Sequence, residues 1–388
     1  MKRDTRIVKA GRSPLDHHGV VNPPVYHAST ILKGSLESFR DGDKTPLEGV
    51  YYGHFGTPTT FAFEDAVAAL EGYDRCVAVP TGIGAIAVPL LALLSAGDHV
   101  LVPDNSYGPT RRFCNNYLAR FGIETTYYDQ SIGGGIAALM TPKTRMVVLE
   151  APGSLTFEVP DSPAIIAAAH AHGAKVMMDN TWSGGVYFAA KGFGVDISVQ
   201  AATKYLSGHS DVMMGTICMD AALHRKIKRT QIDFGYSVAP DDCYLAQRGL
   251  RTLGIRLERH QESALTVAGW LRTRPEVKRL LHPAFADCPG HDYWKRDFTG
   301  STGLFAVVLH DTRQEAVDAL VDALEFFGIG ESWGGFESLV SHPNPRKVRT
   351  AVPWTEAGQV VRFYVGLEDP LDLIADLEKG FNQMAAIG

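Results

Sequence analysis

The sequence predicts an α/β protein with a mostly parallel sheet covered by helices, followed by a smaller α+β domain. Short apolar segments rich in β-formers alternate with longer Ala/Leu-rich segments through the first two thirds of the chain. This alternation is typical of parallel sheets built from strand–helix–strand units. Near Asp241 the pattern changes. The length of 388 residues also exceeds what one hydrophobic core usually supports, which indicates two domains.

Six short apolar segments are predicted as strands of the large sheet: Arg75–Pro80, His99–Pro103, Glu124–Tyr128, Thr144–Glu150, Lys175–Asp179 and Asp196–Gln200. Three longer segments between them have helical composition: Ile83–Leu94, Thr110–Phe121 and Ser162–His172. Ligands of such sheets bind at the carboxyl ends of the strands. We therefore expect the functional residues in the loops that follow these strands.

The last third of the sequence predicts a long helical stretch from Asp241 to Arg274. Two strands are predicted after it, Gly303–His310 and Val360–Val365, together with two helices, Gln314–Phe327 and Pro370–Met384. The first fifty or so residues have little periodicity and carry four prolines: Pro14, Pro23, Pro24 and Pro46. They are predicted to form an extended arm that packs on another subunit. The expected division is an arm at 1–56, a large cofactor-binding domain at 57–250 and a small domain at 251–388.

Composition excludes several classes of protein. The net charge is only −6 and no Lys/Arg cluster is dense, so no nucleic-acid surface is expected. No apolar run reaches membrane-spanning length, and 1–12 is too polar for a signal peptide. The cysteines number five and form no CxxC pair, which argues against a metal site or a disulfide framework. Free thiols in a reducing cytoplasm fit this pattern best.

Four features suggest chemistry, and each has a plainer explanation. The small residues of 80–85 lie between a predicted strand and helix, where backbone amides can hold a phosphate, although a tight turn without a ligand would have the same sequence. Asp179 ends a strand and could pair with a protonated ring nitrogen, or cap a turn. Lys204 has small and apolar neighbours, which suit a Schiff-base lysine better than a solvated one. Arg362 lies inside a strand, where it could hold a carboxylate or form a structural ion pair.

Together, several segments resemble the Cys/Met-metabolism family of pyridoxal-phosphate enzymes of fold type I, and most closely its cystathionine β-lyase branch. The resemblance extends from about Tyr26 to Phe381. Its segments occur in the family's order: Asp179–Asn–Thr–Trp182, Ala201–Ala–Thr–Lys–Tyr205 with Gly208–His–Ser–Asp211, Arg248–Gly–Leu–Arg–Thr–Leu253, Trp294–Lys–Arg–Asp–Phe–Thr–Gly300 and Ser332–Trp–Gly–Gly335. Their joint occurrence is highly specific.

The resemblance implies that pyridoxal 5'-phosphate is the cofactor and that Lys204 carries it, takes the Cα proton of the substrate and helps to protonate the departing sulfur. It implies that Asp179 keeps the pyridine nitrogen protonated and that Tyr107 stacks on the ring. The remaining cofactor contacts that it implies are the amides of Gly82 and Ile83 and the Thr203 hydroxyl on the phosphate.

For the substrate and the assembly, the resemblance implies that Arg362 clamps the substrate α-carboxylate with support from Ser332. It also implies that Tyr52 reaches the phosphate of a neighbouring subunit. The expected assembly is a homotetramer, a dimer of dimers with shared active sites, that acts on a small amino acid and contacts neither nucleic acid nor membrane.

Two positions depart from the family's pattern. His54 stands where an arginine normally binds the phosphate across the dimer, and a neutral imidazole cannot replace a bidentate guanidinium. Weaker cofactor retention is therefore expected unless another basic group compensates. Glu331 stands where β-lyases tend to have tyrosine and γ-lyases and γ-synthases tend to have glutamate, whereas Trp333 remains β-lyase-like.

The expected activity is thus carbon–sulfur β-elimination in the methionine biosynthetic route, from L-cystathionine to homocysteine, pyruvate and ammonia. His54 and Glu331 keep open a specialised lyase that acts at Cγ or on a halogenated or otherwise modified amino acid. A catalytically idle regulatory protein on the same scaffold would be expected to lack Lys204, Asp179, Tyr107 or Arg362, and all four are present.

Overall fold

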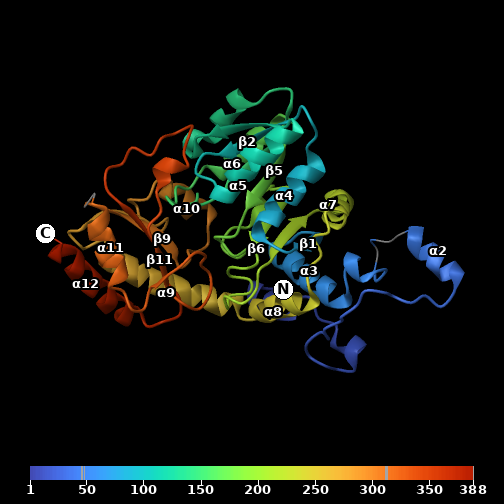
Figure 1. Ribbon diagram of the computed structural model, residues 1–388. Coiled ribbons are helices and arrows are strands. Elements are labelled where there is room, and N and C mark those ends of the chain that lie inside the picture. The colour runs from blue at the N-terminus through green and yellow to red at the C-terminus, as the bar shows by residue number, and fades with distance from the viewer. Residues whose placement is uncertain (45–46, 48, 311–312, 388) are drawn as a thin grey trace. The chain divides into compact units, whose positions relative to one another are not determined.

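The structure, a computed structural model, describes residues 1–44, 47, 49–310 and 313–387 (Figure 1). Of the four prolines in the predicted arm, Pro46 lies outside the described residues. Seven strands form one sheet in the order β1-β7-β6-β5-β4-β2-β3, and five form a second sheet in the order β10-β11-β12-β9-β8. The α/β fold with a large and a small sheet is therefore confirmed. The chain divides into two compact units, 1–95 with 196–254 and 96–195 with 255–388.

The first unit contains three strands of the large sheet, β1 (Arg75–Val79), β6 (Ile197–Ala201) and β7 (Gly215–Met219). Strand β7 pairs antiparallel with both β1 and β6, so β1 and β6 run in the same direction and end at one edge. Its helices are α1 (Arg3–Lys9), α2 (Leu36–Lys44), α3 (Pro58–Glu71), α4 (Gly82–Leu93), α7 (Ala221–Asp233) and α8 (Pro240–Leu250), with 3-10 turns at Pro14–His17 and Gly53–Phe55. Helix α4 packs against β6 and β7, and α3 packs against β1 and α8.

The second unit contains the parallel strands β2 (His99–Pro103), β3 (Glu124–Tyr128), β4 (Thr144–Glu150) and β5 (Lys175–Asp179). Short helices lie between them: α5 (Gly108–Phe113), a π turn (Cys114–Leu118), 3-10 turns (Ala119–Phe121 and Gln130–Leu139) and α6 (Ser162–Ala171). A further 3-10 turn, Ala190–Phe193, follows β5. These four strands have the predicted ranges, because each is a short run of apolar or β-forming residues.

The same unit holds the smaller sheet, which consists of β8 (Val277–Leu281), β9 (Leu304–Leu309), β10 (Gly328–Ile329), β11 (Leu339–Ser341) and β12 (Val360–Tyr364). Its helices are α9 (Leu253–Leu271), α10 (His291–Asp297), α11 (Gln314–Asp322) and α12 (Pro370–Ala386), with a 3-10 turn at Pro345–Lys347. Helices α11 and α12 pack together (Figure 1). With α9, they close a core around Phe305, Phe363 and Phe381.

The structure corrects three predictions and contains elements that were not predicted. The helical stretch from Asp241 to Arg274 is two helices, α8 and α9, because the chain turns at Arg251, whose guanidinium binds the carbonyls of Ile7 and Ala10 at 2.8 Å. The predicted helix Thr110–Phe121 is α-helical only to Phe113. The N-terminal arm contains α1 and α2. The short strand β7, rich in small residues, and the helices α3 and α7 were not predicted.

All five cysteines are buried and free, and none of the side-chain clusters in the described ranges has the composition of a metal site. None of the helices in the described ranges combines the length and the apolar composition that crossing a membrane requires. The division into arm, large domain and small domain stays a prediction.

Candidate active site

In the first unit, the loop between β1 and α4 forms an anion cradle. Thr81 caps the helix: its hydroxyl accepts the N–H of Gly84 at 3.0 Å and its carbonyl accepts the N–H of Ala85 at 3.1 Å. The N–H groups of Gly82 and Ile83 have no acceptor among the described residues. A Cβ at Gly82 would lie 2.7 Å from the Cβ of Ala201, so only glycine fits there. Two unpaired amides at the N-terminus of a 12-residue helix suit a phosphate, and the phosphate contacts of Gly82 and Ile83 stay a prediction.

Lys204 lies in the turn that follows β6. Its backbone N–H donates to the carbonyl of Ala201 at 3.0 Å, and its own carbonyl accepts the N–H of Gly208 at 2.8 Å. The hydroxyl of Thr203 donates to the carbonyl of Met214 at 3.1 Å and accepts the Met214 N–H at 2.9 Å. A hydroxyl has one proton to donate. Thr203 therefore fastens the lysine turn to the loop before β7, and donating to a phosphate would require its hydroxyl to rotate.

Tyr52 and His54 lie in the loop before α3. The Tyr52 side chain is 44% exposed and meets the ring of Phe55 edge-on. His54 Nε2 donates to the backbone carbonyl of Ile232, at the end of α7, over 2.9 Å. His54 is thus anchored to its own chain, and it has none of the fork geometry of the arginine that it replaces.

In the second unit, three neighbouring strands deliver acidic and aromatic residues to one edge of the sheet. Tyr107 follows β2, while Glu150 and Asp179 end β4 and β5 as register partners. The Tyr107 N–H donates to Glu150 Oε2 at 2.7 Å. The N–H and hydroxyl of Thr181 donate to Asp179 Oδ1 at 3.0 and 2.5 Å, which fixes that carboxylate. These contacts place Tyr107 and Asp179 beside a shared acidic neighbour.

Glu150 belongs to this cluster and was not predicted from the sequence. Burial, reinforced by the charge of Asp179, raises its pKa well above the ordinary value. A carboxyl group with a strongly perturbed pKa beside a predicted cofactor ligand marks a functional position. Its place as the last residue of an apolar strand was the signal available in the sequence, because Asp179 was identified on the same ground.

Arg362 is held in the middle of β12, between Ala306 of β9 and Ser341 of β11. Burial lowers its pKa, and the charge of Glu331, followed by that of Tyr107, opposes this shift. Burial raises the pKa of Tyr107, and Asp179, Glu150 and Glu331 add to that effect. Because these charges affect the pKa values of Tyr107 and Arg362, four residues interact electrostatically within the second unit: Tyr107, Asp179, Glu331 and Arg362.

Ser332 and Trp333 are half-buried residues of the loop between β10 and β11. Ser332 adopts a positive φ of 84°, a conformation that L-residues other than Asn and Asp rarely take outside functional loops. Because Ser332 lies between Glu331 and Trp333, its strained backbone fixes the direction of the chain at both neighbours. This is consistent with a loop shaped for a ligand.

Taken unit by unit, the donors suit the chemical groups of pyridoxal phosphate and of an amino acid. The first unit offers a phosphate cradle and a lysine, and the second offers an aromatic ring, a carboxylate and a guanidinium for an amino-acid carboxylate. Asp104 lies three residues before Tyr107. Its carboxylate accepts hydrogen bonds from Arg111, Thr350 and Val352, which support the second set of residues by fixing this part of the chain.

Comparison with known proteins agrees with this chemistry. Residues 4–382 match the family described as Cys/Met metabolism PLP-dependent enzyme. The chain is 43% identical to "Cystathionine beta-lyase MetC" of Escherichia coli, over 98% of each chain. It is 36% identical to "L-alanine/L-glutamate racemase" of Wolbachia pipientis, over 100% of this chain and 98% of the relative. The crystal structure of metB from Corynebacterium glutamicum superposes with a TM-score of 0.92 at 28% identity, covering 98% of each chain.

Proposed function

The chain belongs to the Cys/Met metabolism family of PLP-dependent enzymes, and from that premise we propose that it is a carbon–sulfur β-lyase that converts L-cystathionine and water to homocysteine, pyruvate and ammonia. The observation that carries this proposal is its similarity, over nearly the whole chain, to proteins named as cystathionine β-lyases, at 43% identity for the one from Escherichia coli and 42% for the one from Salmonella typhimurium. The retained Lys204, Asp179, Tyr107 and Arg362 support catalysis rather than an idle scaffold.

In this proposal the residues of the chain hold the cofactor and move protons around it. Pyridoxal phosphate, when bound, supplies an electron sink for the negative charge left at Cα after proton removal. Gly82 and Ile83 would hold the phosphate by their N–H groups, and the Asp179 carboxylate would accept a hydrogen bond from the ring nitrogen and so keep that nitrogen protonated. Lys204 takes the Cα proton and returns a proton to the departing sulfur.

Substrate orientation is assigned to the second unit. Arg362 binds the α-carboxylate by donating two N–H groups to it. The burial that lowers the pKa of Arg362 also strengthens this pair by excluding water. Tyr107 lies against the cofactor ring, with its backbone fixed by Glu150. Ser332 supports the Arg362 position from the strained loop.

Glu331 favours a second candidate function. Its charge acts on both Arg362 and Tyr107, so a carboxylate lies near the residues to which we assign substrate orientation, and we assign it to the distal part of the substrate. A carboxylate there suits a distal ammonium group or a different leaving group, as expected for a γ-lyase or for a lyase of a halogenated or modified amino acid. Lys204 could serve as the base in both eliminations.

The test is to incubate cofactor-loaded protein with L-cystathionine and to identify both products. Pyruvate with homocysteine supports the β-lyase, whereas 2-oxobutyrate with cysteine assigns the enzyme to the γ-lyases. A Lys204→Ala variant serves as the blank, and Glu331→Tyr should leave β-elimination intact. No turnover by cofactor-loaded protein would overturn both assignments for this substrate.

We further propose a cytoplasmic homotetramer, a dimer of dimers in which Tyr52 completes the active site of the adjacent subunit. The N-terminal segment exposes large apolar side chains, among them Leu15 at 92% and Leu32 at 90%, which a second copy would cover. Mixing inactive Tyr52→Ala and Lys204→Ala proteins under subunit exchange should restore part of the activity, because some sites then contain both native residues. Absence of complementation, despite exchange, would contradict shared sites.

A further inference from the structure

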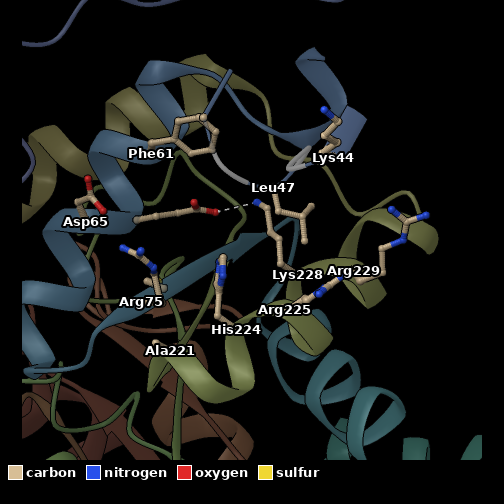
Figure 2. Close-up of a pocket in the computed structure, with 13 residues that line it drawn as sticks. Lys44, Leu47, Phe61, Asp65, Arg75, Ala221, His224, Arg225, Lys228 and Arg229 are labelled. Atoms are coloured by element: carbon tan, nitrogen blue, oxygen red, sulfur yellow. Dashed lines mark hydrogen bonds and ion pairs between the residues drawn. The ribbon is translucent and has the colours of Figure 1, made fainter. Parts of the chain in front are cut away.

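The first unit contains a hollow, and none of the residues that line it belongs to the candidate active site. It has a volume of about 910 Å³ and lies between one face of α7, the beginning of β1 and the middle of α3 (Figure 2). The lining residues are Lys44, Leu47, Gly49, Phe61, Glu64, Asp65, Arg75, Cys76, Ala221, His224, Arg225, Lys228 and Arg229. The spacing of the last five on α7 places them on a single face of that helix.

The lining is strongly cationic. It contains five side chains of Lys or Arg and two carboxylates, so its net charge is +3 in a chain whose overall charge is −6. Arg225 has no counter-ion among the described residues. Arg229 pairs with Asp233 at 3.2 Å and Lys44 with Asp41 at 2.7 Å, but all four side chains are more than half exposed. Such exposed pairs contribute little free energy, so both cations can turn to a ligand.

The floor of this hollow is fixed. Lys228 Nζ lies 3.3 Å from Glu64 Oε1, and the two side chains are only 6% and 8% exposed. The same Glu64 oxygen accepts the N–H of Ala78 at 2.9 Å. A buried, hydrogen-bonded ion pair resists rearrangement, because breaking it leaves an uncompensated charge in the interior. The cations above it therefore surround a preformed cavity.

The pKa of His224 indicates the electrostatic potential inside the hollow. Figure 2 shows its ring extending into the hollow near Arg75 and Lys228. Burial lowers the pKa of His224 to about 4, and the charges of Lys228 and Arg75 add to that effect. The cations are thus only partly neutralised by the protein itself. An anion in the hollow would relieve this excess of positive charge.

We propose that this pocket binds a small oligophosphate anion. Guanidinium groups match phosphate oxygens in bidentate geometry, and Arg75, Arg225 and Arg229 enter the pocket from two different elements. A net charge of +3 favours a multivalent ligand over a monocarboxylate. The volume exceeds that of one phosphate, and Phe61 and Leu47 add an apolar wall. This site is independent of the elimination activity proposed above.

The experiment is calorimetric titration of inorganic pyrophosphate into the cofactor-loaded enzyme at constant ionic strength, because the bound cofactor fills the cradle at Gly82. We expect about one site per chain and clearly weaker binding of inorganic phosphate. Arg225→Gln should weaken pyrophosphate binding by roughly ten-fold or more, the loss of a charge-assisted hydrogen bond. Lys226→Gln is the matched control: it is the next residue of α7, exposed, with the same charge change, and does not line the pocket.

Three results would overturn the proposal. These are no heat of binding up to about ten millimolar pyrophosphate, equal weakening by Arg225→Gln and Lys226→Gln, or equal affinity for phosphate and pyrophosphate. The second would show attraction to the general surface charge. Arg225 is exposed, so its substitution should leave the fold intact, and unchanged circular dichroism and cofactor absorbance verify this without reference to activity.

Discussion

Asp104 is the residue whose removal should most damage the second unit. Its carboxylate is 3% exposed and accepts four groups: Arg111 Nη1 at 2.9 Å, the N–H of Thr350 at 2.9 Å, the Thr350 hydroxyl at 3.2 Å and the N–H of Val352 at 2.8 Å. One carboxylate thereby connects the loop after β2, which carries Tyr107, to a segment almost 250 residues later. Arg111, at 7% exposure, is buried with it.

The expected cost of Asp104→Ala is about 3–5 kcal/mol, the usual loss when one member of a buried ion pair is removed. The Arg111 charge and two backbone N–H groups would remain buried without this acceptor. At about 2 °C per kcal/mol for a domain of 150–250 residues, the thermal midpoint should fall by about 6 °C or more. Asp104→Asn should recover little, because its NH₂ group would face N–H donors.

The assay is thermal denaturation of the cofactor-saturated protein, followed by circular dichroism. Asp287→Ala is the control, because its pair with Arg272 is similar in length at 2.7 Å but exposed, at 42% and 51%. That control should cost about 0–1 kcal/mol. If Asp104→Ala lowered the midpoint by less than 2 °C, or no more than Asp287→Ala, the reasoning from buried charge would be refuted.

The same carboxylate gives a signed pH dependence. Burial would raise the pKa of Asp104, but the N–H groups of Val352, Thr350 and Ala351, together with Arg111, more than offset this, so the net shift is downward. Its stabilisation is therefore complete above the ordinary aspartate pKa of about 4 and is lost as pH falls below it. The difference in midpoint between native protein and Asp104→Ala should stay constant from pH 6 to 8 and shrink below about pH 4.

Three further substitutions test the candidate site. Gly82→Ala should raise the dissociation constant of the cofactor at least ten-fold in a titration of apo-protein, because its Cβ would lie 2.7 Å from that of Ala201; unchanged affinity would contradict the cradle. His54→Arg should tighten cofactor binding roughly ten-fold or more, because a charge-assisted hydrogen bond is gained, although the bond to Ile232 is lost. Equal cofactor affinities of the native and variant proteins would contradict this expectation. Arg362→Lys should raise KM for the amino acid by about ten-fold or more with a smaller change in kcat, because lysine keeps the charge but not the fork; an unchanged KM would remove Arg362 from carboxylate binding.

Much of the second unit was predictable because its elements are continuous patterns along the chain. Strands β2, β4 and β5 have mostly buried apolar residues over five to seven positions, and burial of both faces selects such runs wherever they pair. The edge strand β3 is instead rich in Thr and Tyr, which favour strands. Lys204, Asp179 and Gly82 were found because each follows or ends such a strand. The helix break at Arg251 was not predictable, because it depends on acceptors at Ile7 and Ala10.

The sequence by itself determined the order of strands and helices, which local periodicity records, and the positions of the short motifs at the ends of strands. The resemblance of those motifs to the family implied the type of cofactor and the residues expected to hold it. Only the tertiary structure decided which distant groups share one environment. The pKa of Glu150 is raised because the fold buries its carboxyl group and because β5 places Asp179 beside it, and Asp104 matters because the chain returns to it at Thr350. Electrostatic and hydrogen-bond energies depend on separation in space, which the linear pattern of residues does not record.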